Sequence, residues 1–426
     1  MSGAPCRVVL AGFGTVGRSV ATVLQQLPDE VQLVAVVDRR ASIKAKGWAD
    51  DRVLWTESVE EALDSGADVF VELIGGLDPA ENWIRAALER GIPVVTANKQ
   101  VIAHAGPALW ATAAAHACQL RFEGAVAGGV PVIRAIESGL AGDTLTEVAG
   151  ILNGTCNYIL SSMEQQGAAF ADALKEAQAL GFAEADPSQD VDGRDARAKL
   201  AILAMVALGV QARATSIRNE SIAPVTALDF KYAHALHCTI RQVARAVRGP
   251  DGRTLEASVG PTLVPMSSPL ARVNGSENLV MVKGRFGGET TYGGRGAGGD
   301  PTAVAVVSDV LSIARGARPA ATRPVVAADR VSSDDASPFY VRFTVADRPG
   351  IIAALATIFA AHEINIDAVL QEPGFPASAR PFVVSLDAAP AGHVRAALEA
   401  IAQLDFHVLP PLAMPVLRRA AGAPSA

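Results

Sequence analysis

The sequence predicts an α/β protein: a Rossmann-type doubly wound parallel sheet, then an α+β domain, then a small ferredoxin-like βαββαβ module. Three observations lead to this prediction. Short β-branched runs alternate with helical segments over the first 130 residues, which is typical of parallel βαβ units. Helices expected at 155–166, 170–180 and 194–209, with Gly-rich turns, then replace this alternation, and a strand, turn, helix and strand follow one another again after residue 338.

Length and charge limit the possible functions. A chain of 426 residues has room for two to four domains. Its 37 basic and 44 acidic residues give a net charge of −7 without any basic block. We therefore expect small-molecule partners and neither nucleic acid nor a membrane surface. The N-terminus enters a strand directly, without the charged and apolar segments of a signal peptide, so a cytoplasmic location is expected.

The cysteines give no sign of a disulfide framework or a zinc site. They are far apart, with no CxxC pair and no histidine at a zinc-ligand spacing. We expect them to be reduced thiols. They are Cys6, Cys118, Cys156 and Cys238.

The expected elements of the first domain follow from residue type. A strand at 7–12 precedes a helical segment at 15–27, and the apolar run VQLVAVVD predicts the next strand at 31–38. Three further β-rich runs continue the series. They are DVFVELI at 68–74, IPVVTAN at 92–98 and LRFEGAV at 120–126.

A glycine-rich turn joins the first strand to the first helix. In a GxGxxG turn the first glycine makes the bend, the second lets a pyrophosphate approach the main chain, and the third allows close helix packing. Asp38 ends the second strand at the position expected of a ribose-binding carboxylate. Asp38 favours NAD, whereas Arg39 and Arg40 could meet the 2′-phosphate of NADP, so both cofactors remain open. The turn consists of Gly12, Phe13, Gly14, Thr15, Val16 and Gly17.

An acidic stretch, EADPSQDVDGRDARAK at 184–199, stands before the apolar run LAILAMVALG. Asp195 and Lys199 are four residues apart on an expected helix at 194–209, so they share one face. Such a pair is often only a solvated ion pair. Here the apolar run suggests a buried helix with Lys199 at its entrance. A lysine, unlike an arginine, can release a proton and take it back, which suits the alkoxide left by hydride transfer. Glu184, Asp190 and Asp195 would then receive a cationic group.

A second lysine, Lys99, follows the expected strand at 92–98. This places it at the carboxyl edge of a parallel sheet, where ligands of α/β proteins bind. The alternative is an exposed loop lysine.

The stretch AQALGFAEADPSQDVDGRDARAK resembles the signature of the homoserine dehydrogenase family, and each fixed position of that signature is present. Further stretches are similar to the family: VVTANKQVIA, FEGAVAGGVPVI, GILNGTCNYIL, PTLVP and GRGAGGDPTAVAVVSD. The fixed positions are Ala177, Gly181, Asp186, Pro187, Asp190, Gly193, Asp195 and Lys199. One departure is Cys156, where relatives often have threonine.

The resemblance implies interconversion of L-aspartate 4-semialdehyde and L-homoserine with NADP or NAD, in the biosynthesis of threonine, methionine and isoleucine. It implies Lys199 as the proton donor and Lys99 as a second active-site lysine near the cofactor. Glu184, Asp190 and Asp195 would bind the amino acid, with Gly181 beside it. The turn residues would line the cofactor, and Gly296 or Gly298 of GRGAG would close over it. The resemblance also implies a monovalent cation, usually sodium, on main-chain carbonyls of Glu123, Val126, Gly128 and Val130.

The last module carries Asp347-Arg348-Pro349-Gly350 between an expected strand and helix. This turn resembles the DxPG turn of ACT domains, which implies regulation by an amino acid such as L-threonine. Asp347, Gly350 and Asn365 would contact this effector. The alternative is a module that only dimerises the protein.

These inferences give an expected organisation and leave alternatives open. One alternative is a catalytically silent amino-acid sensor, and another is a dehydrogenase of a different amino-acid semialdehyde. We expect a homodimer or homotetramer. The expected parts are a dinucleotide-binding domain at 1–130 completed by a helix near 301–316, a substrate and oligomerisation domain at 131–318, a linker at 319–337, an ACT domain at 338–415 and a tail at 416–426.

Overall fold

The protein is described here by a computed structural model that covers residues 4–48, 50–318 and 324–417. The expected tail beyond residue 417 and part of the expected linker, 319–323, lie outside this range. The chain forms two compact units, each made of three segments. Unit 1 consists of Met1–Val148, Ala198–Ala214 and Asn278–Ala328, and unit 2 consists of Ala149–Arg197, Thr215–Glu277 and Asp329–Ala426.

Unit 1 contains a six-stranded parallel sheet in the order β3-β2-β1-β4-β5-β6. This is the order of a Rossmann fold, which confirms the predicted fold class. Residues 8–11 of β1 have no exposed surface, as expected for a strand covered on both faces. The strands are β1 Cys6–Ala11, β2 Val31–Val37, β3 Leu54–Thr56, β4 Val69–Glu72, β5 Val94–Thr96 and β6 Leu120–Arg121.

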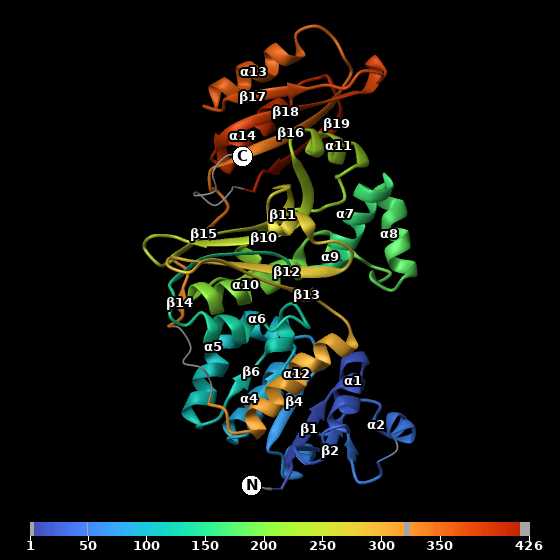
Figure 1. The fold of residues 1–426 in the computed structure, drawn as a ribbon, viewed down its shortest axis with the longest axis vertical. Helices are drawn as coiled ribbons and strands as arrows, with labels where there is room; N and C mark the ends of the chain where they lie inside the picture. The colour runs from blue at the N-terminus through green and yellow to red at the C-terminus, as the bar shows by residue number, and fades with distance from the viewer. Residues whose placement is uncertain (1–3, 49, 319–323, 418–426) are drawn as a thin grey trace. The chain divides into compact units, whose positions relative to one another are not determined.

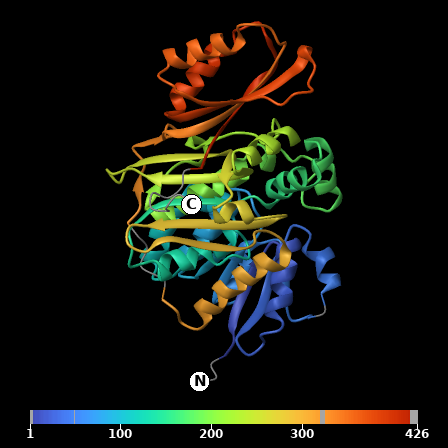
Figure 2. The same ribbon diagram turned by 45° about the horizontal axis from the view of Figure 1, so that its top comes forward.

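Helices from both ends of unit 1 cover this sheet. Helix α12 comes late in the chain, yet it lies alongside α1, as Figures 1 and 2 show. Val306 and Val310 of α12 share a buried cluster with Val8 and Leu10 of β1. The helices include α1 Thr15–Leu24, α2 Ala41–Lys44, α3 Val59–Asp64, α4 Ala80–Glu89, α5 Lys99–Ala115, α6 Val132–Arg134 and α12 Gly299–Ala314.

The run at 120–126 differs from its prediction. Only Leu120–Arg121 is a strand, and Glu123–Ala125 forms a 3₁₀ turn. The turn is stabilised by Asp309, whose carboxylate accepts the main-chain N–H of Glu123 at 2.9 Å. Because this bond joins residues far apart in the chain, local residue preference could not reveal it.

Unit 2 begins with helices that the sequence predicts closely. The expected helices at 155–166 and 170–180 are α7 Gly154–Gln166 and α8 Phe170–Ala179. The long antiparallel hairpin of β10 and β11 was not predicted. Most of β10 is buried on both faces, so its sequence lacks the alternation that marks a half-exposed strand. The remaining bounds are α9 Ser188–Val191, α11 Ala227–Ala235, β9 Arg218–Asn219, β10 Cys238–Arg248, β11 Thr254–Pro265 and β15 Arg330–Ser332.

The chain passes between the units five times, and a strand or an α-helix carries three of these passages. Strand β7 Leu145–Ile151 leads from unit 1 into unit 2, and helix α10 Arg194–Leu208 leads back. Strand β12 Glu277–Gly284 returns the chain to unit 1, where it neighbours β13 Gly288–Arg295. The helix predicted at 194–209 is thus confirmed as α10.

The C-terminal module has the strand order β17-β18-β16-β19, all antiparallel, with two helices. This is a ferredoxin-like βαββαβ fold, as predicted. Phe339, Val341 and Phe343 of β16 pack in one cluster with residues of both helices. The elements are β16 Ser337–Val345, α13 Ile351–Ala361, β17 Ile366–Leu370, β18 Arg380–Ala389, α14 Ala391–Ile401 and β19 His407–Pro415.

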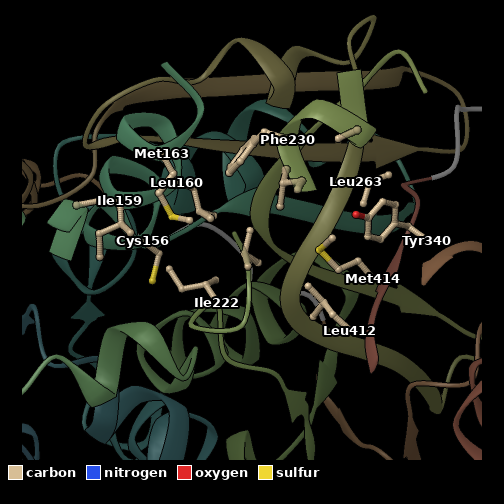
Figure 3. Packing of buried hydrophobic residues seen from close by; sticks show 14 of the residues in the cluster. Cys156, Ile159, Leu160, Met163, Ile222, Phe230, Leu263, Tyr340, Leu412 and Met414 are labelled. Carbon is tan, nitrogen blue, oxygen red and sulfur yellow. The ribbon is translucent and has the colours of Figure 1, made fainter. Parts of the chain in front are cut away.

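The other face of this small sheet is buried within unit 2. Tyr340, Leu412 and Met414 share a cluster with Cys156 and Leu160 of α7, and Figure 3 shows these side chains together. Alternate residues of β16 therefore face two different cores, which explains the consecutive apolar residues FYV at 339–341.

A buried ionic network joins the same face to α11. Tyr340 donates its hydroxyl hydrogen to Asp229 at 2.7 Å, and Arg342 pairs with Asp229 at 2.5 Å. Burial first, and then the charge of Asp229, raises the pKa of Tyr340. The module is thus anchored to the rest of unit 2 by both apolar packing and a satisfied buried charge.

Two short strands lie within the stretch expected to be a linker. Strand β14 Val326–Ala327 pairs with β8 Val210–Gln211 in unit 1. Strand β15 pairs with β11 in unit 2. Within the described residues, no helix has the length and apolar character needed to cross a membrane.

Candidate functional site

The glycine-rich turn has different steric demands at each glycine. Gly12 has a φ of +94°, and a Cβ there would lie 2.8 Å from the main chain of Leu73. A Cβ at Gly17 would lie 2.0 Å from the carbonyl oxygen of Gly12, so α1 could not approach the turn. At Gly14 a Cβ would meet no atom within 4 Å. Gly12 and Gly17 are therefore required by the fold, while Gly14 faces open space at the start of α1.

Asp38 organises this turn. Its carboxylate accepts the main-chain N–H groups of Phe13 and Arg40, both at 2.9 Å, and pairs with Lys44 at 2.5 Å. Burial tends to raise the pKa of Asp38, but the bonds from Lys44, Phe13 and Arg40 outweigh it and the pKa is lowered. Asp38 is therefore ionised at neutral pH. Together with Arg39 and Arg40, Lys44 places three cationic side chains within six residues of it.

The carboxyl ends of β4 and β5 carry a second polar network. Glu72 is fully buried and accepts the N–H of Ile74 at 2.8 Å and the hydroxyl of Thr96 at 2.6 Å. Burial raises the pKa of Glu72. Asn98 accepts the N–H groups of Gln100 and Val101 as the N-cap of α5. Lys99, the first residue of α5, is half-buried directly after this cap.

The loop at 123–130 is a tight turn held by the GRGAG segment. Ala127 and Gly128 both have positive φ, at 54° and 41°. A Cβ at Gly128 would lie 2.7 Å from the carbonyl oxygen of Gly296, and Gly296 itself is buried against Asn278. By contrast, Gly298 is exposed at the N-terminus of α12.

No cluster of three His, Cys, Asp or Glu side chains able to hold a metal occurs among residues 4–48, 50–318 and 324–417.

Asp190 and Asp195 are brought together in unit 2. The side-chain amide of Asn153 donates to Asp190 at 2.6 Å and to Asp195 at 2.9 Å. Both carboxylates are half-buried, while Asn153 is only 4% exposed. Two acids that are five residues apart in sequence are thus linked through one neutral amide.

The remaining residues of the acidic stretch lie nearer the surface. Glu184 and Gly181 are exposed, and the amide of Gln178 holds the main-chain carbonyl of Glu184 at 3.0 Å. Asp186 accepts the N–H of Ser188 at 3.1 Å, which lowers its pKa.

Helix α10 carries Lys199 as the sequence predicts. Lys199 is half-buried, whereas Leu200, Ile202 and Leu203 have no exposed surface. The lysine therefore lies where α10 passes from its polar start into the core. Asp195 precedes it by one helical turn on the same face.

The expected effector residues lie at opposite ends of α13. Asp347 pairs with Arg380 at 2.5 Å, and Gly350, with a φ of +96°, begins the helix. Asn365 follows the helix and donates its amide to Asp387 at 2.7 Å.

Sequence reasoning missed three residues that organise these sites: Lys44, Glu72 and Asn153. Lys44 stands six residues after Asp38, so a search for cations beyond the next two positions could have found it. Asn153 lies in the quoted stretch GILNGTCNYIL, and an Asn before a helix signals an N-cap. Nothing local indicates that the same amide reaches residues 37 and 42 positions away.

Comparison with known proteins agrees with these features. Family models match at residues 12–123 (homoserine dehydrogenase, NAD binding domain), 131–311 (homoserine dehydrogenase) and 339–403 (ACT domain).

Named relatives cover nearly the whole chain. A homoserine dehydrogenase of Mycobacterium tuberculosis is 41% identical over 86% of this chain and 87% of its own length. One from Synechocystis is 38% identical over 94% and 96%. The crystal structure of a homoserine dehydrogenase from Thiobacillus denitrificans has a TM-score of 0.88 and 36% identity, covering 97% of this chain and 98% of that one. The chain therefore belongs to the homoserine dehydrogenase family, NAD(P)-dependent oxidoreductases that act on a CH–OH group, and it carries a C-terminal ACT domain.

Proposed function

We propose that Lys199 donates the proton when L-aspartate 4-semialdehyde is reduced to L-homoserine, and removes it in the reverse direction. Bound NAD(P)H supplies the hydride. Hydride addition to the aldehyde carbon leaves a negative oxygen that needs a proton and a nearby positive charge. An ammonium group gives both, because unlike a guanidinium it can release its proton. The observation that carries this proposal is the position of half-buried Lys199 on α10, one turn after Asp195.

Asp190 and Asp195 bind the α-ammonium group of the substrate in this proposal, with Glu184 and Gly181 at the exposed rim. Asn153 joins the two carboxylates through a neutral amide, which adds no positive charge that would compete with a cationic ligand. Glu184 is exposed, so we expect it to contribute less than the two aspartates.

Lys99 binds at the nicotinamide side of the cofactor and orients the substrate. The network of Glu72, Thr96 and Asn98 supports this role because it fixes the start of α5. The carboxyl edge of a parallel sheet is the usual ligand position in this fold.

The glycine-rich turn binds the cofactor pyrophosphate, and its open space at Gly14 fits a closely approaching ligand. We propose NADP as the preferred cofactor, with Lys44, Arg39 and Arg40 binding the 2′-phosphate. Asp38 is ionised and paired with Lys44, and the three cationic side chains beside it outnumber this one carboxylate, which supports binding of a 2′-phosphate. A related archaeal homoserine dehydrogenase, 26% identical, has been solved in complex with NADPH.

Several finer roles complete the proposal. The loop carbonyls of Glu123, Val126, Gly128 and Val130 hold a monovalent cation such as sodium. The ACT module binds an amino-acid effector such as L-threonine through Asp347, Gly350 and Asn365. The enzyme works as a homodimer or homotetramer in the cytoplasm, on the route to threonine, methionine and isoleucine.

The first test is oxidation of L-homoserine with NADP+ and with NAD+, followed as absorbance at 340 nm. We expect Lys199→Ala to lower kcat by about 10²–10⁴-fold, the usual contribution of a general acid or base. Lys175→Ala is the matched control, since Lys175 is an exposed helical lysine of α8. Full activity of Lys199→Ala would show that the lysine is structural. Faster turnover of another amino-acid semialdehyde would reassign the substrate.

A further inference from the structure

We infer that Asn153 is a positioning residue that sets the orientation of Asp190 and Asp195 for the substrate ammonium group. The inference rests on the proposed substrate role of these two acids. It concerns a residue that touches neither substrate nor cofactor in the proposal and acts through its two carboxylate partners.

The orientation of the Asn153 side-chain amide is fixed by the hydrogen bond that its oxygen accepts. Asn153 is the N-cap of α7, and its side-chain oxygen accepts the N–H of Cys156 at 2.8 Å. Since the oxygen is committed to the helix, the NH₂ group must point away from it. Its two hydrogens are then available for Asp190 at 2.6 Å and Asp195 at 2.9 Å.

The main chain around this cap is fixed independently. The Cys156 thiol donates to the carbonyl oxygen of Asp190 at 3.1 Å, and Gln242 donates to the same oxygen at 3.3 Å. A Cβ at Gly154 would lie 2.6 Å from the carbonyl oxygen of Ser276, so the start of α7 packs closely against the main chain there. The backbone of Asp190 is therefore held without Asn153, and the amide is left to orient the two side chains.

The chemistry of the amide matters as much as its position. Two carboxylates close together repel, and each needs donors. An arginine or lysine at position 153 would supply donors but would also cancel the negative charge that attracts an ammonium group. Asparagine donates two hydrogen bonds and adds no charge. It is thus suited to hold the two acids without adding a positive charge of its own.

Asn153→Ser separates the cap from the positioning role. Serine is also a good N-cap residue, but it cannot donate to both carboxylates. We expect a rise of about 10- to 100-fold in KM for L-homoserine, because hydrogen bonds to charged groups are lost. The KM for NADP+ should stay close to wild type, and the melting temperature should fall no further than in the Asn157→Ser control described below.

Asn153→Asp gives a second readout. Aspartate is also a good N-cap residue, but here it brings a third carboxylate to the other two. Mutual repulsion should raise the pKa values of the group. We expect the acid limb of the pH profile of kcat/KM for L-homoserine to move to higher pH, which a purely structural defect would not produce.

The matched control is Asn157 on the same helix. Asn157 is fully buried and donates its amide to the main-chain carbonyls of Val273 and Gly275. Asn157→Ser should lower stability while leaving the homoserine KM and the pH profile unchanged. Unaltered KM and pH profile in both Asn153 variants would overturn the inference. If the wild type itself does not oxidise L-homoserine, the proposed function fails and the role of Asn153 fails with it.

Discussion

The cofactor turn of unit 1 and the acidic segment of unit 2 organise their binding groups in opposite ways. In the turn, one carboxylate, Asp38, collects main-chain N–H groups and shapes the loop. In the acidic segment, the side-chain amide of Asn153 donates to two carboxylates and orients their side chains. The first arrangement presents the main chain to a ligand, and the second presents charge.

This difference determines which kind of binding site can be recognised from the sequence. A main-chain binding site needs glycine at fixed spacings, since other residues would clash with the backbone at Gly12 and Gly17. Such a requirement can be recognised in a short stretch of sequence. A site made of oriented side chains needs a bond between residues far apart in the chain, which no local pattern records.

The largest expected effect separates two glycines of the same turn. Gly17→Ala forces a Cβ to within 2.0 Å of the Gly12 carbonyl oxygen, and such overpacking costs about 1–3 kcal/mol or more. We expect a lowered melting temperature and loss of cofactor binding. Gly14→Ala should leave the melting temperature unchanged and weaken only NADPH binding, measured by fluorescence titration. Equal melting temperatures for both variants would contradict the steric account of the turn.

Lys44→Ala sharpens the role of charge beside the turn. Losing a charge-assisted bond to the 2′-phosphate should raise KM for NADP+ by about 10- to 100-fold. The KM for NAD+ should change little, because NAD has no 2′-phosphate. Lys46→Ala, two residues further on, is the control. An equal loss with both cofactors would indicate that Lys44 only supports Asp38.

A smaller effect should appear in the pH dependence of stability. Unlike Asp38, Glu123 and Glu137 of unit 1 each have a pKa raised to about 7, first by burial and then by the charge of Asp309. With a folded pKa above the unfolded value of 4.5, each group binds more protons in the folded state. Stability should therefore fall as pH rises from about 4.5 to about 7.

Glu137→Gln tests the predicted pH dependence of stability, with the melting temperature measured by differential scanning calorimetry. Glu137 lines a cavity of about 290 Å³ together with Glu123 and Asp309. The variant should lose part of the decline in melting temperature between pH 5 and pH 8. A melting temperature that rises over this range in the wild type would show that the two glutamates are ionised in the folded protein.

Much of the fold was predictable because its elements obey local rules. The strands β1, β2, β4 and β5, the helices α7, α8 and α10 and the C-terminal βαββαβ order follow from alternation and periodicity, whereas the three-residue strand β3 was not predicted. The hairpin of β10 and β11 was missed because burial on both faces removes alternation. The run at 120–126 was misjudged because Asp309 imposes the turn from far along the chain.

The candidate site was predictable where a residue type is itself the signal. The glycine turn, Asp38, Lys99 and the acids before Lys199 could be named from their order. Lys44, Glu72 and Asn153 act through partners that only the fold brings close.

The contrast between the two regions is tested most directly by the separate KM values for L-homoserine and NADP+ in Asp195→Asn. We predict that KM for L-homoserine rises by about 10- to 100-fold, because a charged acceptor is lost, while KM for NADP+ stays near wild type. Lys44→Ala should show the reverse pattern. A parallel rise in both constants in Asp195→Asn, or no rise in either, would contradict the division of substrate and cofactor recognition between the acidic segment and the glycine-rich turn.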